Sequence, residues 1–350
     1  MTQRSRWHPL LLAFRLALTA GLMAWILWQL DWPLIGQKLG GAAWGWAGLA
    51  VLAYGVTTGL SILRWQLLLR ACHTGIRLVR TAQLTMIGLF CSAFLPGVVG
   101  GDVVKAVYAS RELPTIKPAV VVSIMMERLL GFLAMFVTST ALICVRWEPL
   151  TSEPATRLAV YGYFGFYALV FMGLALLTWF QVERWLPAFK NRRLKEAYRE
   201  AGESYRLFLR HPVCLWGGLA ISCAAHFALM SVFFCVAEAL RMNLNFWDLA
   251  AVLPLVGLVT LLPVTINGFG LREVAFSHFL LFAGMTPEAS VTLSLLGTAI
   301  IMGWSLLGGL VFLQFRSQVP VPSLTEAAES NQLDDLWQPS GKESSSVGQP

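Results

Sequence analysis

The sequence has few charged residues. Only 13% of its 350 residues are Asp, Glu, Lys or Arg, and 57% are hydrophobic, whereas charged residues make up about a quarter of a soluble domain. This composition excludes an ordinary soluble globular protein. We therefore expect an all-α protein that crosses a membrane several times, because a helix satisfies its own backbone hydrogen bonds inside lipid.

The sequence also lacks the short motifs of common catalytic and cofactor sites. It contains no P-loop, zincin helix, nucleophile elbow or Asp-x-Asp pair. Its six cysteines lie in or beside apolar runs without the spacing of metal ligands, at positions 72, 91, 144, 214, 223 and 235. We therefore expect no metal ion, no cofactor, no disulfide framework and no nucleic-acid partner.

Six apolar runs have the roughly 20 residues that a helix needs to cross a hydrocarbon core about 30 Å thick. The first run follows a basic N-terminal end, but it lacks a small-residue cleavage site and is longer than a signal-peptide core, so we interpret it as a span. The six predicted spans are Leu10–Leu30, Ala42–Leu63, Ala119–Val145, Leu158–Val182, Val213–Leu240 and Ala289–Phe315.

Two further apolar runs, Thr81–Leu95 and Leu249–Leu262, are too short to cross. At 1.5 Å per residue they reach only about 21–23 Å before they meet proline and glycine. We expect each to enter the membrane, turn, and leave on the side from which it came, as a re-entrant hairpin. The turn residues would be Pro96, Gly97, Gly100 and Gly101 in the first hairpin, and Pro263, Asn267, Gly268 and Gly270 in the second.

The distribution of Lys and Arg predicts the orientation. With two re-entrant hairpins and a cytoplasmic N-terminus, nineteen of the 26 Lys and Arg residues lie on the cytoplasmic side and four lie outside. Eight of the nineteen fall between Arg184 and Arg210. Because basic residues accumulate in cytoplasmic loops, we expect an integral protein of the cytoplasmic (inner) membrane with both termini in the cytoplasm.

This topology divides the chain into two similar halves. Residues 1–157 would form one membrane repeat with a cytoplasmic-side hairpin, and residues 158–316 a second repeat with an external-side hairpin. Three crossings per repeat invert the second repeat relative to the first, which is an arrangement typical of transporters. Residues 317–350 are rich in Pro and Ser and poor in apolar residues, so we expect a disordered cytoplasmic tail.

Charged residues follow the turn of the first hairpin. Asp102 is either the N-cap of a returning helix over Val103–Arg111 or a direct participant in substrate or cation handling. Lys105 lies one turn later, where it belongs either to a basic collar or to a site that holds a lipid phosphate.

Glu127 and Arg128 lie roughly 13–15 Å along the third predicted span. Charges at that depth are costly, and neighbours on a helix point about 100° apart, so each needs a different partner. One interpretation is a set of interhelical ion pairs, Glu127 with Lys105 or Arg272 and Arg128 with Asp102. The other is a polar cavity lined by these residues.

In the second hairpin, Arg272 and Glu273 begin the returning helix. Glu273 suits the positive end of that helix, whereas Arg272 opposes it and therefore indicates a nearby anion, either a carboxylate or a substrate phosphate. We interpret His226 and His278 as hydrogen-bonding partners of neighbouring helices rather than proton relays. We attribute Arg15, Arg64 and Glu238 to span ends, where long side chains extend toward water.

Several of these residues together resemble one family. The segments that carry the resemblance are Arg64-Trp65, Pro96…Gly100-Gly101-Asp102…Lys105, Glu127-Arg128 and Pro263…Gly268-Phe269-Gly270-Leu271-Arg272-Glu273. They resemble the lysylphosphatidylglycerol synthase transmembrane-region family, the flippase-like integral membrane proteins, over about residues 10–315. Lys105 stands where the family often has Arg, and Gly97 where Ser is common, and neither departure removes the charge or the turn.

The resemblance implies lipid translocation. We expect a flippase-like transporter that moves an anionic or phosphate-containing lipid, with Lys105, Arg128 and Arg272 binding the substrate and Asp102, Glu127 and Glu273 supporting a polar path. The family implies membrane lipids as partners, whether phospholipid, hopanoid or polyprenyl-phosphate-linked. The soluble aminoacyl-transferase domain of the full synthases is missing, so we expect the chain not to make lysylphosphatidylglycerol.

Two alternatives stay open. The first is a membrane-embedded enzyme that transfers a group to or from a lipid phosphate, with Asp102 or Glu127 as base. The second is a non-catalytic scaffold that holds a lipid-synthesis enzyme through the basic loop at 183–212.

Overall fold

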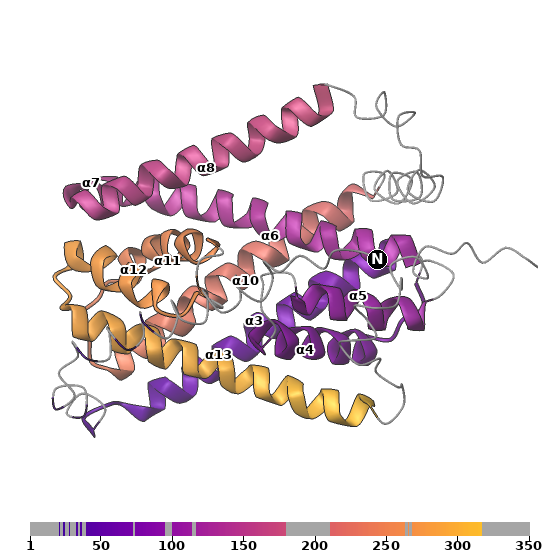
Figure 1. Cartoon of the computed structure of the whole chain (residues 1–350), viewed down its shortest axis with the longest axis horizontal. Coiled ribbons are helices and arrows are strands. Elements are labelled where there is room, and N and C mark those ends of the chain that lie inside the picture. The colour runs from indigo at the N-terminus through magenta and orange to yellow at the C-terminus, as the bar shows by residue number, and fades with distance from the viewer. Residues whose placement is uncertain are drawn as a thin grey trace, which may run out of the picture.

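The structure is a computed structural model of the whole chain, in which every regular element of the described part is a helix (Figure 1). The described residues are 40–72, 74–94, 100–113, 117–179, 211–262, 265 and 268–316, with a few isolated positions before residue 40.

Five helices of the described part are long and apolar enough to cross a membrane. Four of them lie within a few residues of the predicted spans, but the helix predicted over Ala42–Leu63 continues to Ala71. The predicted span Leu10–Leu30, the loop at 183–212 apart from its last two residues, and the predicted tail lie outside the described residues. The five helices are α3 (Trp44–Ala71), α6 (Lys117–Val145), α8 (Pro154–Trp179), α10 (Pro212–Ala239) and α13 (Pro287–Arg316).

Shorter helices lie where the two hairpins were predicted. α4 (Leu78–Phe94) packs against α5 (Gly100–Glu112), and α11 (Phe246–Thr260) packs against α12 (Leu271–Phe279). At 1.5 Å per residue, α4 and α11 reach about 26 and 23 Å, less than the hydrocarbon thickness. The remaining short elements are α7 (Trp147–Ser152) and the 3-10 turn η5 (Leu281–Ala283), and the turn residues Pro96, Gly97, Pro263 and Asn267 lie outside the described residues.

Glycine allows α4 and α5 to approach closely. A Cβ atom at Gly101 would lie 1.9 Å from Ser92 Oγ and 2.2 Å from the Gly88 carbonyl oxygen, so a larger residue would push the two helices apart. Of the two alternatives for Asp102, the N-cap of a helix beginning at Val103 is not the one observed. α5 begins at Gly100, which places Asp102 inside the first turn, because the two glycines adopt helical geometry instead of ending the turn.

The second hairpin uses glycine for a different purpose. Gly268 and Gly270 have φ angles of +75° and +82°, in the region where a side chain is strained. Gly270 precedes α12, and its backbone N–H donates to Glu273 Oε2 at 2.7 Å. The first turn of α12 is therefore closed by its own carboxylate.

The two halves of the chain pack in corresponding ways. α3 contacts α4 and α6, as α10 contacts α11 and α13, and α5 contacts α4 and α6, as α12 contacts α11 and α13. Between the halves, α3 packs along α10, and the contact of α4 with α13 has a counterpart in the contact of α11 with α6. In Figure 1 the α4–α5 pair lies at one end of the long axis and the α11–α12 pair at the other.

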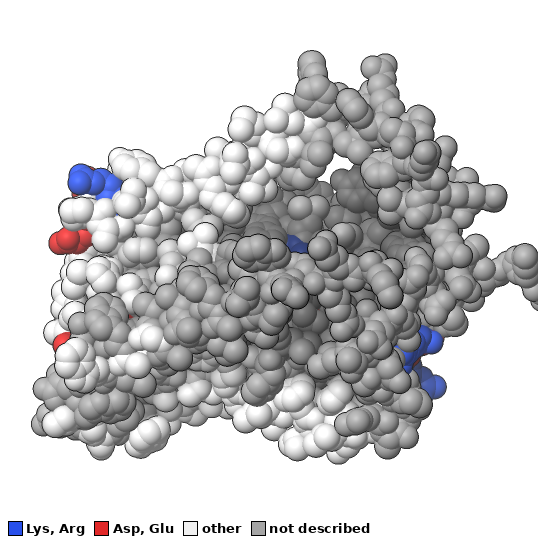
Figure 2. All heavy atoms as spheres, in the orientation of Figure 1, with Lys and Arg blue, Asp and Glu red and all other residues white. Residues whose placement is uncertain are grey.

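The outer surface suits a lipid environment. Large apolar side chains are exposed along α3 and α8, including Leu52, Val56, Leu158 and Leu169, on a scale that a water-soluble monomer does not tolerate. On the face shown in Figure 2, charged side chains of described residues lie mainly at the two ends of the long axis. The described surface between them is almost uncharged, as expected for a belt of protein within a bilayer.

Candidate functional site

Glu127 on α6 joins two cations from different helices. Its Oε2 lies 2.6 Å from Lys105 Nζ on α5, and its Oε1 lies 3.0 Å from Arg64 Nη2 on α3. Glu127 and Lys105 are 8% and 4% exposed, so the carboxylate is almost fully removed from solvent. Such a buried cluster requires every charge to keep its partner.

Arg64 is the residue whose role the sequence interpretation missed. The apolar pattern places Arg64 at a span end, but α3 continues past it to Ala71, and its side chain is only 14% exposed. In addition to Glu127, it donates from Nη1 to Ser222 Oγ on α10 at 3.0 Å. The sequence did contain a signal for this role, because Arg64-Trp65 is one of the segments that carry the family resemblance. A side chain that only extends toward water would not need a particular neighbour.

Trp65 fixes the position of Lys105. The ammonium nitrogen of Lys105 lies 3.8 Å from the centroid of the Trp65 ring, a cation–π contact. The indole Nε1–H donates to Ser123 Oγ on α6 at 3.1 Å. Trp65 therefore orients the lysine toward Glu127 while α3 remains packed on α6.

Arg128, the neighbour of Glu127, points in another direction as predicted. Its Nε lies 2.5 Å from Asp102 Oδ2 on α5. The Arg128 side chain is 49% exposed and that of Asp102 18%, so this pair is much more open than the Glu127 cluster. Both ion pairs of the first interpretation, Lys105 with Glu127 and Arg128 with Asp102, are present.

These charged groups also line a cavity of about 500 Å³. The cavity lies between α3, α4, α5, α6, α10 and α11, and its charged lining residues are Arg64, Asp102, Lys105, Glu127 and Arg128. The two interpretations of the charged residues are therefore compatible, since the ion pairs form the wall of a polar cavity. We call this cavity the α5 chamber.

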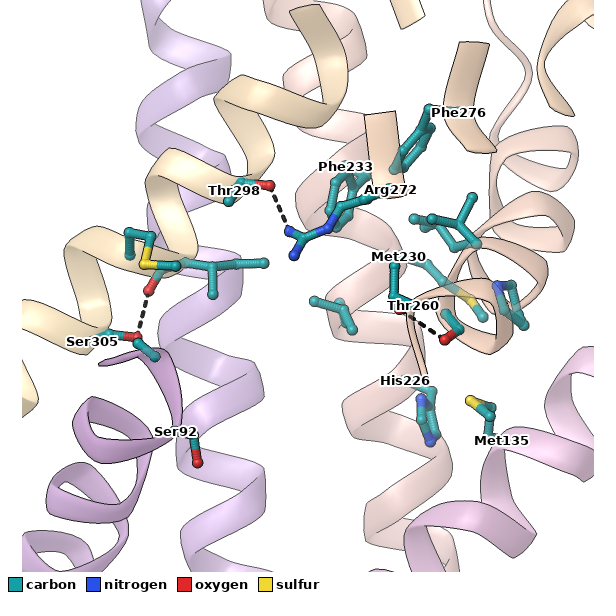
Figure 3. A pocket seen from close by; sticks show the side chains of 18 of the residues that line it. Ser92, Met135, His226, Met230, Phe233, Thr260, Arg272, Phe276, Thr298 and Ser305 are labelled. Atoms are coloured by element: carbon teal, nitrogen blue, oxygen red, sulfur yellow. Dashed lines mark hydrogen bonds between the residues drawn. The ribbon is translucent and has the colours of Figure 1, made fainter. Parts of the chain in front are cut away.

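Arg272 on α12 lies at a second cavity, shown in Figure 3. Its Nη1 donates to Thr298 Oγ1 on α13 at 2.6 Å. The neighbouring Glu273 is fully buried and is directed away, since its oxygens accept from the Gly270 backbone and from Ser294 Oγ at 2.9 Å. Arg272 and Glu273 thus have different surroundings despite being adjacent.

The second cavity, which we call the α12 chamber, has a volume of about 350 Å³. Its walls are mostly apolar and come from α4, α6, α10, α11, α12 and α13, with Met230, Phe233 and Phe276 among them (Figure 3). Among the described residues that line this chamber, Arg272 is the one Asp, Glu, Lys or Arg. Its guanidinium is therefore placed in a region of low polarity, where an anion would be attracted strongly.

The two chambers adjoin. Six residues line both of them, namely Leu89, Ser92, Met135, His226, Leu229 and Gly257. They come from α4, α6, α10 and α11, so elements of both halves form the junction. The charged residues of the first half and Arg272 of the second consequently face one connected region.

Of the two histidines, His226 agrees with the interpretation as an interhelical hydrogen-bonding residue and His278 does not. His226 at the junction is hydrogen-bonded through Nε2 to the Gly131 carbonyl oxygen on α6 at 3.1 Å. His278 is exposed, and its Nδ1 contacts the Val274 carbonyl oxygen of its own helix at 2.9 Å, so its predicted interhelical partner is wrong. The alternative pairing of Glu127 with Arg272 is not the one formed, since Lys105 and Arg64 hold both oxygens of Glu127.

The long apolar helices and the lipid-facing surface define a polytopic α-helical membrane protein. Comparison with known families refines this class, because the sequence model described as the lysylphosphatidylglycerol synthase TM region matches residues 12–308. The chain belongs to this family, a family of membrane regions linked to lipid modification or transport. No curated protein and no solved structure matches the chain.

Proposed function

We propose that the protein is a flippase-like transporter that moves an anionic or phosphate-containing lipid across the cytoplasmic membrane. The observation that carries the proposal is the junction of the two chambers, which connects cations contributed by both halves within an otherwise apolar helix bundle. Arginine recognises phosphate through paired N–H donors. Arg128 and Arg272 would bind the phosphate, with Lys105 adding positive charge.

The corresponding packing of the two halves supports the topology of this proposal. We infer that residues 1–157 and 158–316 are inverted repeats, with α4–α5 and α11–α12 as hairpins that enter from opposite sides of the membrane. Inverted repeats with a binding site at their interface permit alternating access to the two sides. The termini would then be cytoplasmic.

The ion pairs disfavour the enzymatic alternative. A general base needs a carboxylate that can accept a proton from the substrate. Asp102 is held by Arg128, and Glu127 is held by both Lys105 and Arg64. Both oxygens of Glu127 and Oδ2 of Asp102 are thus engaged by cations instead of being directed at a substrate proton.

A liposome assay tests the transport proposal. Purified protein is reconstituted with a fluorescent phospholipid or polyprenyl phosphate, and translocation is followed by the loss of accessible fluorescence. Arg128→Ala and Arg272→Ala are expected to slow translocation at least about tenfold, because each removes a charge-assisted contact with phosphate. Wild-type rates in both variants would rule out these residues as the substrate site.

Matched controls separate the site from general damage. Arg157→Ala removes an exposed arginine at the start of α8, and it should translocate lipid at the wild-type rate. Gly257→Leu would place a side chain at the junction, at a position where an added Cβ atom has nothing within 4 Å. Gly165→Leu on the exposed face of α8 is equally uncrowded, so it should remain active where Gly257→Leu is inactive.

A further inference from the structure

Two ion pairs of opposite polarity join α5 to α6. On α5, Asp102 precedes Lys105 by about one turn, and on α6 the two partners are adjacent in sequence. Lys105 Nζ lies 2.6 Å from Glu127 Oε2, and Arg128 Nε lies 2.5 Å from Asp102 Oδ2. Both pairs line the α5 chamber, so a ligand that enters this chamber meets both.

The two pairs differ in accessibility. The side chains of Lys105 and Glu127 are 5% and 10% exposed, whereas that of Arg128 is 49% exposed. Glu127 is also held by Arg64 on α3, and breaking this buried cluster would leave charges without partners. The pair of Arg128 with Asp102 reaches solvent, where an ion pair is separated at little cost. A ligand would therefore open the Arg128–Asp102 pair in preference to the buried one.

Asp102 can release Arg128 without losing its place. It lies in the first turn of α5, where the positive end of the helix stabilises a carboxylate. The backbone beside it is fixed against α4, because a Cβ atom at Gly101 would lie 1.9 Å from Ser92 Oγ. The carboxylate is thus held by its own helix and does not depend on the guanidinium.

We propose that Asp102 is an internal competitor of the headgroup phosphate for Arg128. This inference rests on the proposed transport function and adds the regulation of the same site. With the chamber empty, the carboxylate holds the guanidinium. An entering phosphate displaces the carboxylate from Arg128, and the carboxylate returns when the headgroup leaves. Asp102 thereby lowers the affinity of the site and favours release of the headgroup.

The sign of the effect of Asp102→Asn on anion binding tests the proposal. The purified full chain in uncharged detergent is titrated with dodecyl phosphate, and binding is followed by calorimetry. We expect the variant to bind about three- to tenfold more tightly than the wild type, because the competing charge is gone. Damage to the fold would not tighten binding. A carboxylate that only positions Arg128 for the phosphate would weaken binding on removal, so equal or weaker binding would overturn the inference.

Arg128→Gln separates competition from a general loss of negative charge. In this background the arginine for which Asp102 competes is absent, so adding Asp102→Asn should tighten binding by about twofold or less. Equal gains in the two backgrounds would overturn the inference, whereas a complete loss of binding in Arg128→Gln would place the gain at Arg128. Glu148→Gln makes the same chemical change at an exposed carboxylate of α7, and it should bind as the wild type does.

The liposome assay distinguishes this inference from the proposed function. With fluorescent polyprenyl phosphate, Asp102→Asn should reach half of its maximal translocation rate at a lower lipid concentration than the wild type. If the wild type moves the lipid and the variant needs a higher concentration, the competition is wrong and lipid transport stands. If neither protein binds dodecyl phosphate or moves a fluorescent phosphate lipid, the proposed function itself is wrong.

Discussion

The two short helix pairs place charged residues in similar positions but hold them in different ways. At the α4–α5 pair, Lys105 and Asp102 are paired with Glu127 and Arg128 of α6. At the α11–α12 pair, Glu273 is held by a backbone N–H and Ser294, and Arg272 donates to Thr298. The first pair is anchored by opposite charges and the second by neutral hydrogen-bonding groups.

This difference indicates where the protein would respond to an anionic ligand. In the proposed function, a phosphate would compete directly with the carboxylate of Asp102 for Arg128 in the α5 chamber. At Arg272 it would meet a guanidinium that already donates to the Thr298 hydroxyl. We therefore expect the α5 pair to be more sensitive to changes of charge, and the α12 pair to depend more on its glycine backbone and hydroxyl groups.

The largest expected difference between the two pairs is the side of the membrane that they face. Lys105 is buried behind Glu127, so better labelling positions are Arg111 at the end of α5 and His278 near the end of α12, both exposed. With the six native cysteines replaced, Arg111→Cys should react with an impermeant maleimide from the cytoplasm. His278→Cys should react only from outside, because the proposed hairpins are inverted.

Labelling is measured in right-side-out and inside-out vesicles. A cysteine at the exposed position of Glu148 in α7, which the proposed topology places outside, should react from the same side as His278→Cys. Reaction of Arg111→Cys and His278→Cys from the same side would exclude inverted hairpins.

Stability should change more when a charge pair is broken than when a hydroxyl contact is lost. Glu127→Gln leaves Arg64 and Lys105 without their shared carboxylate and is expected to cost about 3–5 kcal/mol. Ser294→Ala removes a donor to the buried Glu273 and should cost about 1–3 kcal/mol. Unfolding of the detergent-solubilised protein followed by circular dichroism gives both values.

The control for this comparison is Glu148→Gln, which changes an exposed carboxylate of α7 in the same way as Glu127→Gln. It should unfold like the wild type. A loss for Ser294→Ala as large as that for Glu127→Gln would show that the two helix pairs depend equally on their polar partners.

The smallest expected effects come from the ion pairs at the periphery. Arg80 pairs with Glu112 between α4 and α5, and Arg146 pairs with Asp248 at the start of α11 at 2.5 Å. The side chains of Arg80 and Glu112 are 27% and 20% exposed, and partly exposed pairs contribute about 1 kcal/mol or less. Asp248 is only 10% exposed, so Arg146→Gln should cost more than Arg80→Gln. Arg80→Gln should therefore lower the unfolding midpoint only slightly, and a loss comparable to Glu127→Gln would contradict this ranking.

Much of the helical framework could be predicted from the sequence. Four of the described spans begin and end within a few residues of the predicted apolar runs, because lipid selects long apolar helices by length and composition alone. The short lengths of α4 and α11 were also predictable, since Leu-Pro and glycine end the apolar runs. The exact start of α5 was not, because glycine is compatible with both a turn and a tightly packed helix.

Arg64 shows why the candidate site could be predicted only in part. The apolar run stops at Leu63, so a hydropathy pattern places the end of the span there. The helix continues because Glu127 and Ser222, 63 and 158 residues away in sequence, compensate the guanidinium. No local pattern contains that information.

The sequence by itself determined the membrane class, the family and the residue types available for the site, because hydrophobicity and glycine or proline content act locally. The tertiary structure decided which charges meet. It paired Glu127 with two cations and Arg128 with Asp102, turned Glu273 away from Arg272, and brought six residues of both halves to one junction. Electrostatic partners are set by distance in space, and helices from different parts of the chain define that distance only when they pack.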